Sequence, residues 1–220
     1  MLSPDVKQKW NLQFGLGIKL PTGDYKYQDY FYRNDSTKVL SLVNPSILLG
    51  DGGTGIITEL NTFYILNKTV SLYGNFYYLL NPRDQNGQSF TTGRPINPIR
   101  IKAGADELIV PDVFSIRAGA YINCNKFSIS AGFRKEGSPV RDIIGESNGD
   151  RRAGYNLSVE PGVLYKLKKT TLYAYLPVTV ARNVKQTIPD KNISKIIGVK
   201  TISPGSSADY LVFLGVAFKL

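Results

Sequence analysis

The chain contains no histidine and a single cysteine among its 220 residues. Without histidine, Ser–His and Cys–His nucleophile pairs and imidazole-ligated metal sites are excluded. Cys124 stands alone, so the chain forms no internal disulfide and carries no CxxC motif. An enzyme would have to use a lysine or carboxylate base. We therefore expect no enzymatic activity and no cofactor or metal.

Long hydrophobic runs are also missing. No uninterrupted apolar segment approaches the ~20 residues that a membrane-spanning helix needs. This excludes a helical membrane protein. The first ten residues, MLSPDVKQKW, place Pro4 and Asp5 where the apolar region of a signal peptide would lie, so no such peptide is visible.

Positive charge is in excess but is not concentrated in one part of the chain. The net charge is +10, and most lysines and arginines lie in Gly-, Pro-, Asn- and Asp-rich segments rather than in a run or along one helix face. Such dispersion is typical of a solvated surface. We expect no nucleic-acid partner.

The main positive signal is an alternation of apolar and polar residues. In WNLQFGLGIKL (10–20), every even position is apolar and every odd position is polar or glycine. This period of two predicts a strand with one apolar face. The pattern predicts about eight strands and no amphipathic helix. The other seven segments are 54–66, 69–80, 113–122, 127–135, 154–166, 171–181 and 209–220.

The connections between these strands alternate in length. Very short turns are expected at 66–68, 123–126 and 167–169, and long polar loops without regular structure at 21–52, 81–111, 136–153 and 183–208. Short turns at one end and long loops at the other are typical of an outer-membrane barrel, and the strand lengths fit the ~9–11 residues of a tilted spanning strand. Pro161 and Pro177 interrupt two adjacent strands and predict a bulge or bend there.

The composition of the two faces bears on what each face touches. In a sandwich or lipocalin-type barrel the apolar face points inward, whereas in a transmembrane barrel it points outward. Here the other face is rich in Gly, Ser, Asn and Tyr and holds few charges, which favours lipid contact. Sequence pattern therefore predicts an all-β, antiparallel transmembrane β-barrel. The apolar face also carries aromatic residues near the strand ends, where interfacial girdles lie: Trp10, Tyr64, Tyr165, Tyr210 and Phe218.

Four segments carry a resemblance to a known family. They are FGLGIKLPTGDY (14–25), GDGGTGIITEL (50–60), residues 133–165 with GESNGDRRAGY and SVEPG, and ADYLVFLGVAFKL (208–220). From Met1 to Leu220 the chain resembles the outer-membrane transporters named for the meta-pathway of phenol degradation, in their Bacteroidetes-type members. Leu220 stands where that family usually has a terminal aromatic residue.

The resemblance implies a monomeric barrel of the bacterial outer membrane that passes small, hydrophobic or aromatic molecules. It further implies that residues 1–220 form a single barrel domain, the C-terminal part of a roughly 12-stranded barrel. On this interpretation the N-terminal strands and signal peptide precede the present segment, and residues 3–9 form a periplasmic turn.

In the membrane interpretation the polar face lines the lumen. Arg117 and Arg134 lie on neighbouring strands and Glu160 on the next, so these charges are expected to meet inside the barrel. Two interpretations stay open: a selectivity constriction of facing charges, or an internal network that plugs a narrow barrel. The candidate lumen-lining residues are Lys19, Glu59, Tyr73, Tyr77, Arg117, Tyr121, Arg134, Glu160, Tyr173 and Tyr175.

Two loop features have weaker implications. The glycine-rich segments 21–25 and 50–55 lack the following helix and GK[ST] of a phosphate-binding loop, so we interpret them as tight turns at the barrel rim. Five basic residues surround one predicted extracellular loop and could contact lipopolysaccharide or an anionic substrate, or be merely solvated. They are Arg134, Lys135, Arg141, Arg151 and Arg152.

The sequence thus favours an outer-membrane channel or passive transporter. The expected partners are outer-membrane lipid, lipopolysaccharide and a small hydrophobic or aromatic solute. Two alternatives remain: a plugged structural or adhesion barrel that acts through its long loops, and a soluble lipocalin-like carrier with an apolar cavity.

Overall fold

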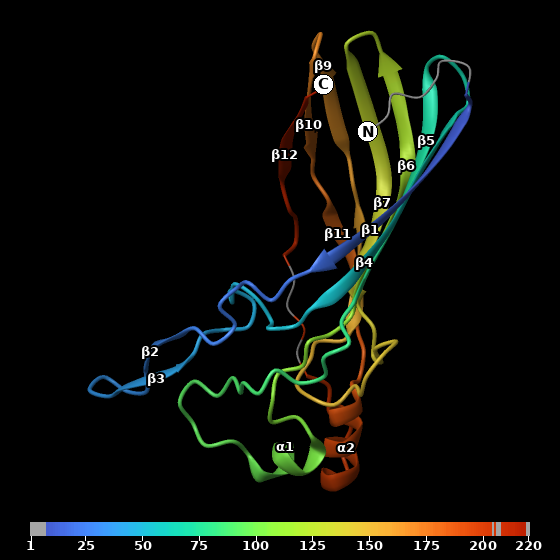
Figure 1. The fold of residues 1–220 in the computed structure, drawn as a ribbon. Coiled ribbons are helices and arrows are strands. Elements are labelled where there is room, and N and C mark those ends of the chain that lie inside the picture. The colour runs from blue at the N-terminus through green and yellow to red at the C-terminus, as the bar shows by residue number, and fades with distance from the viewer. Residues whose placement is uncertain (1–7, 204, 206–207, 219–220) are drawn as a thin grey trace.

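The protein is an antiparallel β-sheet curled into a half-barrel, with long loops gathered at one end (Figure 1). The computed structural model describes residues 8–203, 205 and 208–218. The expected turn at 3–9 lies largely outside the described residues, and Leu220 lies wholly outside them. All strand pairings in this sheet are antiparallel, as expected.

The sheet is eight strands wide, in the order β1-β4-β5-β6-β7-β9-β10-β12. Two positions in this order are each occupied by two strands, because β8 continues into β9 and β10 continues into β11 after an interruption. The sheet therefore contains ten strands in all. The strands are β1 (Trp10–Lys19), β4 (Gly55–Ile65), β5 (Val70–Leu80), β6 (Val113–Cys124), β7 (Phe127–Ser138), β8 (Gly154–Val159), β9 (Gly162–Lys166), β10 (Thr170–Tyr175), β11 (Val178–Val184) and β12 (Phe213–Phe218).

The two interruptions coincide with prolines. Pro161 separates β8 from β9, and Pro177 separates β10 from β11, because proline has no N–H to give to the ladder. The register of β11 against β8 also shifts between Thr179 and Ala181, which marks a bulge. The expected bend is thus confirmed. The ladder continues through the first break, since Glu160 and Gly132 exchange backbone hydrogen bonds of 2.8 and 3.2 Å.

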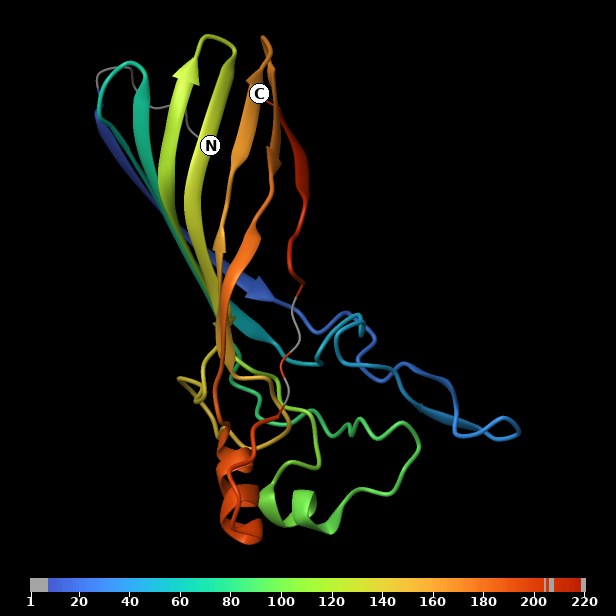
Figure 2. The ribbon, with the colours of Figure 1, turned by 180° about the vertical axis from the view of Figure 1, so that it is seen from behind.

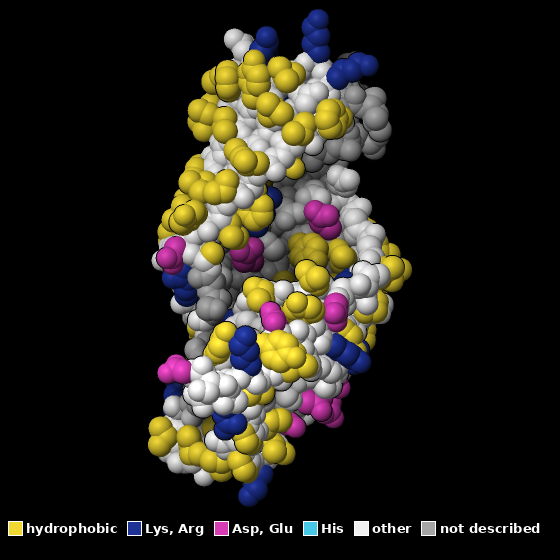
Figure 3. All heavy atoms as spheres, turned by 90° about the vertical axis from the view of Figure 1, so that its left-hand side faces the viewer, with side chains coloured by type: hydrophobic (Ala, Val, Ile, Leu, Met, Phe, Trp, Pro, Cys, Tyr) yellow, Lys and Arg dark blue, Asp and Glu magenta, His cyan; other side chains and the backbone are white. Residues whose placement is uncertain are grey.

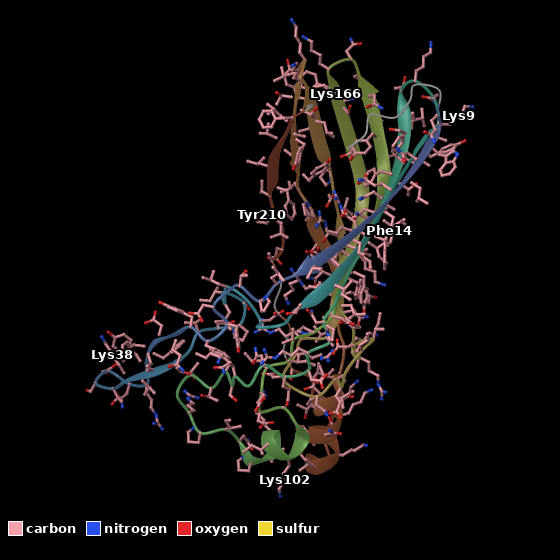
Figure 4. All side chains as sticks on the ribbon, in the orientation of Figure 1. Lys9, Phe14, Lys38, Lys102, Lys166 and Tyr210 are labelled. Carbon is pink, nitrogen blue, oxygen red and sulfur yellow. The ribbon has the colours of Figure 1, made fainter. Side chains whose placement is uncertain are left out.

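The apolar side of the sheet faces outward and is exposed. On β7, Ile129 and Phe133 are 59% and 60% exposed, whereas Ser128 and Ser130, between and beside them, are both 2% exposed. The same polarity holds on β1, where Phe14 is 68% exposed (labelled in Figure 4). Hydrophobic side chains accordingly cover much of the upper sheet in the space-filling view of Figure 3. The small polar residues lie on the inside of the curl.

The sheet does not close on itself. Among the described residues, β1 pairs only with β4, and β12 pairs only with β10 over its length. Each therefore presents one unpaired edge, and the expected barrel is present as an open half-barrel.

The two ends of the sheet differ. The turn end carries the short turns at 66–69, 125–126 and 167–169, and the loop end carries the long connections (Figures 1 and 2). The prediction that the long loops lack regular structure is wrong. The loop after β1 contains a hairpin of β2 (Gln28–Tyr32) and β3 (Lys38–Leu42), which projects away from the sheet. Two helices, α1 (Pro98–Ala103) and α2 (Ile188–Ile197), pack together beyond the loop end.

Capping explains both helices. Asn97 accepts a hydrogen bond from the first turn of α1, and Thr187 forms a capping box with Asp190 at the start of α2. Gly104 and Gly198 end them in the left-handed conformation.

The buried apolar core lies at the loop end rather than against the sheet. We call residues 81–112, 139–153 and 185–203 the loop cap. Val110 is fully buried, and most of the other buried apolar residues also belong to the loop cap. The buried apolar residues are Leu42, Val43, Ala103, Ala105, Leu108, Ile109, Val110 and Ala153. The hydrophobic effect thus folds the loop cap, while backbone hydrogen bonds dominate the sheet.

Candidate functional site

The strand register places polar side chains in rows across the inside of the curl. Residues paired in register share one face of a sheet, so a row of partners runs from strand to strand. One such row, which we call the polar row, is polar on all seven strands that it crosses. It consists of Gln13, Asn61, Asn75, Arg117, Arg134, Ser158 and Thr179.

A buried carboxylate joins the centre of the polar row. Glu160 is 1% exposed and forms ion pairs with both Arg117 and Arg134. The Nε of Arg117 donates to Oε1 of Glu160 at 2.9 Å, and Arg134 donates to the other oxygen. Each carboxylate oxygen therefore has its own guanidinium, which is the arrangement that makes a buried charge tolerable. The structure brings these three residues together as the sequence predicts.

Four of the predicted tyrosines lie beside this cluster, toward the turn end. The hydroxyls of Tyr121 and Tyr175 are 3.1 Å apart, and the Arg117 guanidinium lies 5.3 Å from the centre of the Tyr175 ring. The ring of Tyr73 is 4.8 Å from that of Tyr121, centre to centre, and the ring of Tyr173 is 5.7 Å from that of Tyr175. Together with Glu160 and its arginines they form one aromatic and ionic cluster.

Glycines on the neighbouring strands make room for these rings. A Cβ at Gly215 of β12 would collide with the ring of Tyr173, and a Cβ at Gly162 of β9 would collide with that of Tyr175. The glycines of the polar face therefore let inward tyrosines lie against the sheet backbone, a close approach that any side chain would block.

Two buried hydroxyls in this region lack a partner among the described residues. They are the Oη of Tyr73 and the Oγ of Ser130. Buried polar groups are usually hydrogen-bonded, so each can take a hydrogen bond from water or solute inside the curl.

Glu59 forms a second polar group on the adjacent row, toward the loop end. Its Oε1 accepts hydrogen bonds from Asn61 at 3.0 Å and Asn75 at 3.1 Å. Tyr77 is the register partner of Glu59 on β5. The carboxylate of Glu59 is therefore held by side-chain amides of the polar row, whereas that of Glu160 is held by arginines.

Lys19 continues the polar lining to the loop end. Its Nζ forms an ion pair with Asp51 and donates to Oδ1 of Asn81 at 3.1 Å. Asp51 in turn lines a cavity of about 330 Å³ between residues 45–51 and the loop cap. Apolar side chains such as Phe90 and Leu108 share that cavity with charged ones. The polar face of the sheet therefore leads into a cavity at its loop end.

Asp150 is the second acidic residue that lines this cavity. Burial raises its pKa above the ordinary carboxyl value, while the Arg100 guanidinium, 2.9 Å from its carboxylate, acts in the opposite direction. Burial has the larger effect. Asp150 is thus more easily protonated than a solvated aspartate.

A buried network of charged residues anchors the loop cap to the sheet. Asp112 is fully buried and accepts hydrogen bonds from the Tyr78 hydroxyl at 2.8 Å and from the backbone N–H of Asn81 and Ile143. Nearby, Asp142 forms a buried ion pair with Arg151. Sequence reasoning missed Asp112 and Asp142, because an aspartate next to a strand end is an ordinary turn signal.

The five basic residues predicted around one loop have separate environments. Arg134 and Lys135 belong to β7, and the Arg151 side chain is buried against Asp142. Arg152 donates to the Ser46 hydroxyl at 3.1 Å. Arg141 is an exposed loop residue that takes part in none of the ion pairs among the described residues. They do not form a common basic surface.

Neither a metal site in the described ranges nor sequence similarity points to a function. In the described ranges, no group of three or more His, Cys, Asp or Glu residues is placed to hold a metal ion. No helix of the described part is long and apolar enough to cross a membrane. No protein-family model matches the chain, and no curated protein matches it in sequence. Assignment of a function therefore depends on the geometry of the sheet and its cap.

Proposed function

We propose that the protein is a β-barrel protein of the bacterial outer membrane whose polar inner face lines a path for small solutes. The observation that carries this proposal is the polarity of the sheet. Small polar residues such as Ser128 and Ser130 are buried inside the curl, while Ile129 and Phe133 on the same strand project outward and are exposed. A water-soluble sheet has the opposite polarity.

The size of the exposed apolar face supports contact with lipid. Leu16 and Ile18 are each 71% exposed, and similar residues follow on the other strands around the outside of the curl. Soluble monomers seldom expose continuous apolar patches beyond a few hundred Å². Hydrocarbon would cover this face at a gain of about 25 cal/mol per Å² of apolar area.

The dimensions and ends of the sheet also fit a bilayer. Strands β1, β4, β5, β6 and β7 contain 10 to 12 residues, close to the ~9–11 that a tilted spanning strand needs. At the turn end Trp10 is the register partner of Tyr64, and the tilted rings of Phe127 and Tyr165 lie 4.6 Å apart, centre to centre. Lys9 and Lys166 adjoin Trp10 and Tyr165 in the chain and lie at the turn end of the sheet (Figure 4). An aromatic belt followed by charge is the pattern of a membrane interface.

A sealed wall requires partners for β1 and β12, because unpaired strand edges do not occur in hydrocarbon. The sheet is eight strands wide with antiparallel neighbours, so β1 and β12 run in opposite directions. Antiparallel pairing can therefore join them, either directly or through an even number of further strands.

Selectivity in this proposal comes from the aromatic and ionic cluster. A solute moving along the inside of the curl meets Arg117, Glu160 and Arg134, and the rings of the inward tyrosines. The one positive charge left over in this group is balanced by Glu136, 3.4 Å from Arg134. Neutral solutes that can stack on rings and accept hydrogen bonds would pass with the least desolvation cost. The cavity that Asp51 lines is the entrance from the loop end.

A plugged structural or adhesion barrel is the second candidate, and one observation favours it. The Tyr121 and Tyr175 side chains reach each other across the inside of the curl, so the lumen is narrow at that level. In this alternative the cluster closes the barrel and the loops carry the function. A soluble carrier with an inward apolar face is less well supported, because the apolar face is the exposed one.

Fractionation and conductance test the proposal in sequence. The protein is expressed with a signal peptide, and its membrane fraction is run on a gel with and without boiling. The proposal predicts outer-membrane localisation and faster migration when unboiled. Recovery in the soluble fraction without a mobility shift would contradict it. Single-channel steps in planar bilayers would support the channel, and their absence from a correctly closed barrel would support the plugged alternative.

A further inference from the structure

We propose that a basic groove on the loop cap binds the phosphate group of an anionic ligand. The groove has a volume of about 460 Å³ and lies along α2, where that helix faces the loop between β7 and β8. It is separate from the cavity that Asp51 lines and from the inside of the curl. We call it the α2 groove, and its lining consists of Arg141, Gln186, Ile188, Lys191, Asn192, Ser194 and Lys195.

Three cations converge on the α2 groove without a counter-charge. Lys191 and Lys195 are four residues apart on α2 and so lie on one face of the helix, where like charges repel. Arg141 comes from a loop about fifty residues earlier in the chain. Among the described residues, none of the three takes part in an ion pair, and no acidic residue lines the groove.

The acidic residues nearest in sequence are turned toward other partners. Asp142 follows Arg141, but its carboxylate is buried in the ion pair with Arg151. Asp190 precedes Lys191, but its oxygens accept hydrogen bonds from Thr187 and Ser203. The positive charge of the groove is therefore left for a ligand to neutralise.

The floor of the groove is held in place before any ligand arrives. Gln186 donates to the Ser194 hydroxyl at 2.8 Å and to the Thr201 carbonyl at 3.0 Å. Asn192 donates to the Ala103 carbonyl of α1 at 3.2 Å, which ties the two helices together. A preorganised floor lowers the ordering cost that binding would otherwise have to overcome.

These features indicate the ligand chemistry. A guanidinium can bind two phosphate oxygens at once, while two ammonium groups add point charges that can be shared among the remaining oxygens. A phosphate near pH 7 carries more than one negative charge and three strong acceptor oxygens, which three cations can match. The groove is also large enough to hold part of the group that bears the phosphate. The proposal does not depend on the membrane location of the sheet.

Calorimetric titration of the purified protein with inorganic pyrophosphate at low ionic strength tests this site. The variant Lys191→Gln/Lys195→Gln removes two cations while keeping side chains of similar length. Each lost charged contact should weaken binding about tenfold, so we expect the double variant to bind about a hundredfold more weakly. Circular dichroism confirms that the variant is folded.

The matched control is Lys126→Gln/Lys166→Gln, which removes the same charge at the exposed turn end. It should bind pyrophosphate as the unmodified protein does. Failure of the unmodified protein to bind pyrophosphate would overturn the proposal. Equal loss in both double variants would also overturn it, because the effect would then come from net charge alone.

A second titration distinguishes the source of the phosphate. Micelles of a phosphorylated glycolipid are compared with micelles of the same lipid after its phosphates are removed. Tighter binding of the phosphorylated lipid than of pyrophosphate, lost in Lys191→Gln/Lys195→Gln, identifies a lipid headgroup. Preference for pyrophosphate identifies a free phosphate compound. Equal binding of lipid with and without phosphate through these lysines contradicts recognition of phosphate.

Discussion

The hydroxyl groups of Tyr121 and Tyr175 lie 3.1 Å apart although two strands, β7 and β9, separate β6 from β10. On a flat sheet, three steps of ~4.8 Å would keep these positions ~14 Å apart. The two side chains meet because the sheet curls and both point to its inside. The same curl brings Arg117 of β6 to Glu160 beyond β8. The aromatic and ionic cluster is thus a product of curvature and of inward polarity together.

Removing the charge of Glu160 should destabilise the fold strongly. In Glu160→Gln, Arg117 and Arg134 keep their positive charges but lose the shared carboxylate, and both guanidinium groups are largely buried. We expect a loss of about 3 kcal/mol in the free energy of unfolding, measured by urea titration. The control Glu136→Gln touches Arg134 only at 3.4 Å and is a third exposed, so it should cost less than about 1 kcal/mol. Equal effects of both changes would contradict a buried ionic centre.

Adding a methyl group at Gly215 should disturb the packing of Tyr173. The new Cβ would collide with that ring, so Gly215→Ala should cost about 1–3 kcal/mol in unfolding free energy. In Gly215→Ala/Tyr173→Ala the collision is absent, and the two effects should be less than additive. The control Gly17→Ala brings its Cβ to an ordinary 3.5 Å from Ile57 and should be tolerated. Additive losses would show that the ring does not rest on Gly215.

A charge placed on the outer face should show whether that face contacts lipid or water. Phe133 lies near the middle of β7 and is 60% exposed. If this face contacts lipid, Phe133→Lys should destabilise the inserted protein by about 2–4 kcal/mol and lower its yield in the outer membrane. Ile143→Lys, at a 67% exposed position of the loop cap, should have little effect. A Phe133→Lys protein that inserts as well as the unmodified one would contradict lipid contact.

The pH dependence of the free energy of unfolding should reveal the contribution of the Asp190 carboxylate in the loop cap. Burial acts to raise its pKa, but hydrogen bonds from Ser203 and Thr187 outweigh burial and hold the pKa below the ordinary value of 3.8. The ionised carboxylate therefore stabilises the fold above about pH 4, and this contribution disappears as the pH falls through the folded-state pKa. Asp190→Asn should be less stable than the unmodified protein at pH 7 by about 1 kcal/mol. Urea titrations from pH 7 to 3 should show the two stabilities converging, and a constant difference would contradict the assignment.

Much of the sheet could be predicted from the sequence, because alternation reports directly on a strand with two different faces. It located the eight wall strands, and the hairpin 113–135 brought Arg117 next to Arg134. It could not show where the sheet would end, since pairing at the edges of β1 and β12 is a long-range property. The open edge of the half-barrel therefore appears only in the structure.

The loop cap was harder to predict, for two physical reasons. The signals of α2 were present in Thr187, Asp190 and Gly198, and its isoleucines have helical spacing. A helix of only ten residues is nevertheless too short for that period to stand out in a polar loop. The buried network that anchors the loop cap consists of Asp112 and the pair of Asp142 and Arg151. It depends on tertiary contacts between loops thirty residues apart. Arg151 looked like a solvated loop cation, and burial against Asp142 is what sequence alone could not reveal.

The most direct test of the central claim is an accessibility scan along β7 in lipid. After Cys124→Ser removes the chain's one thiol, single cysteines are placed at positions 128 to 131 and 133 and labelled with a fluorophore in reconstituted bilayers. The account predicts that labels at 129, 131 and 133 are quenched by a lipid-borne quencher and shielded from an aqueous one. Labels at 128 and 130 should be shielded from the lipid-borne quencher. Quenching that is uniform along the strand, or of the opposite phase, would contradict an outward apolar face in contact with lipid.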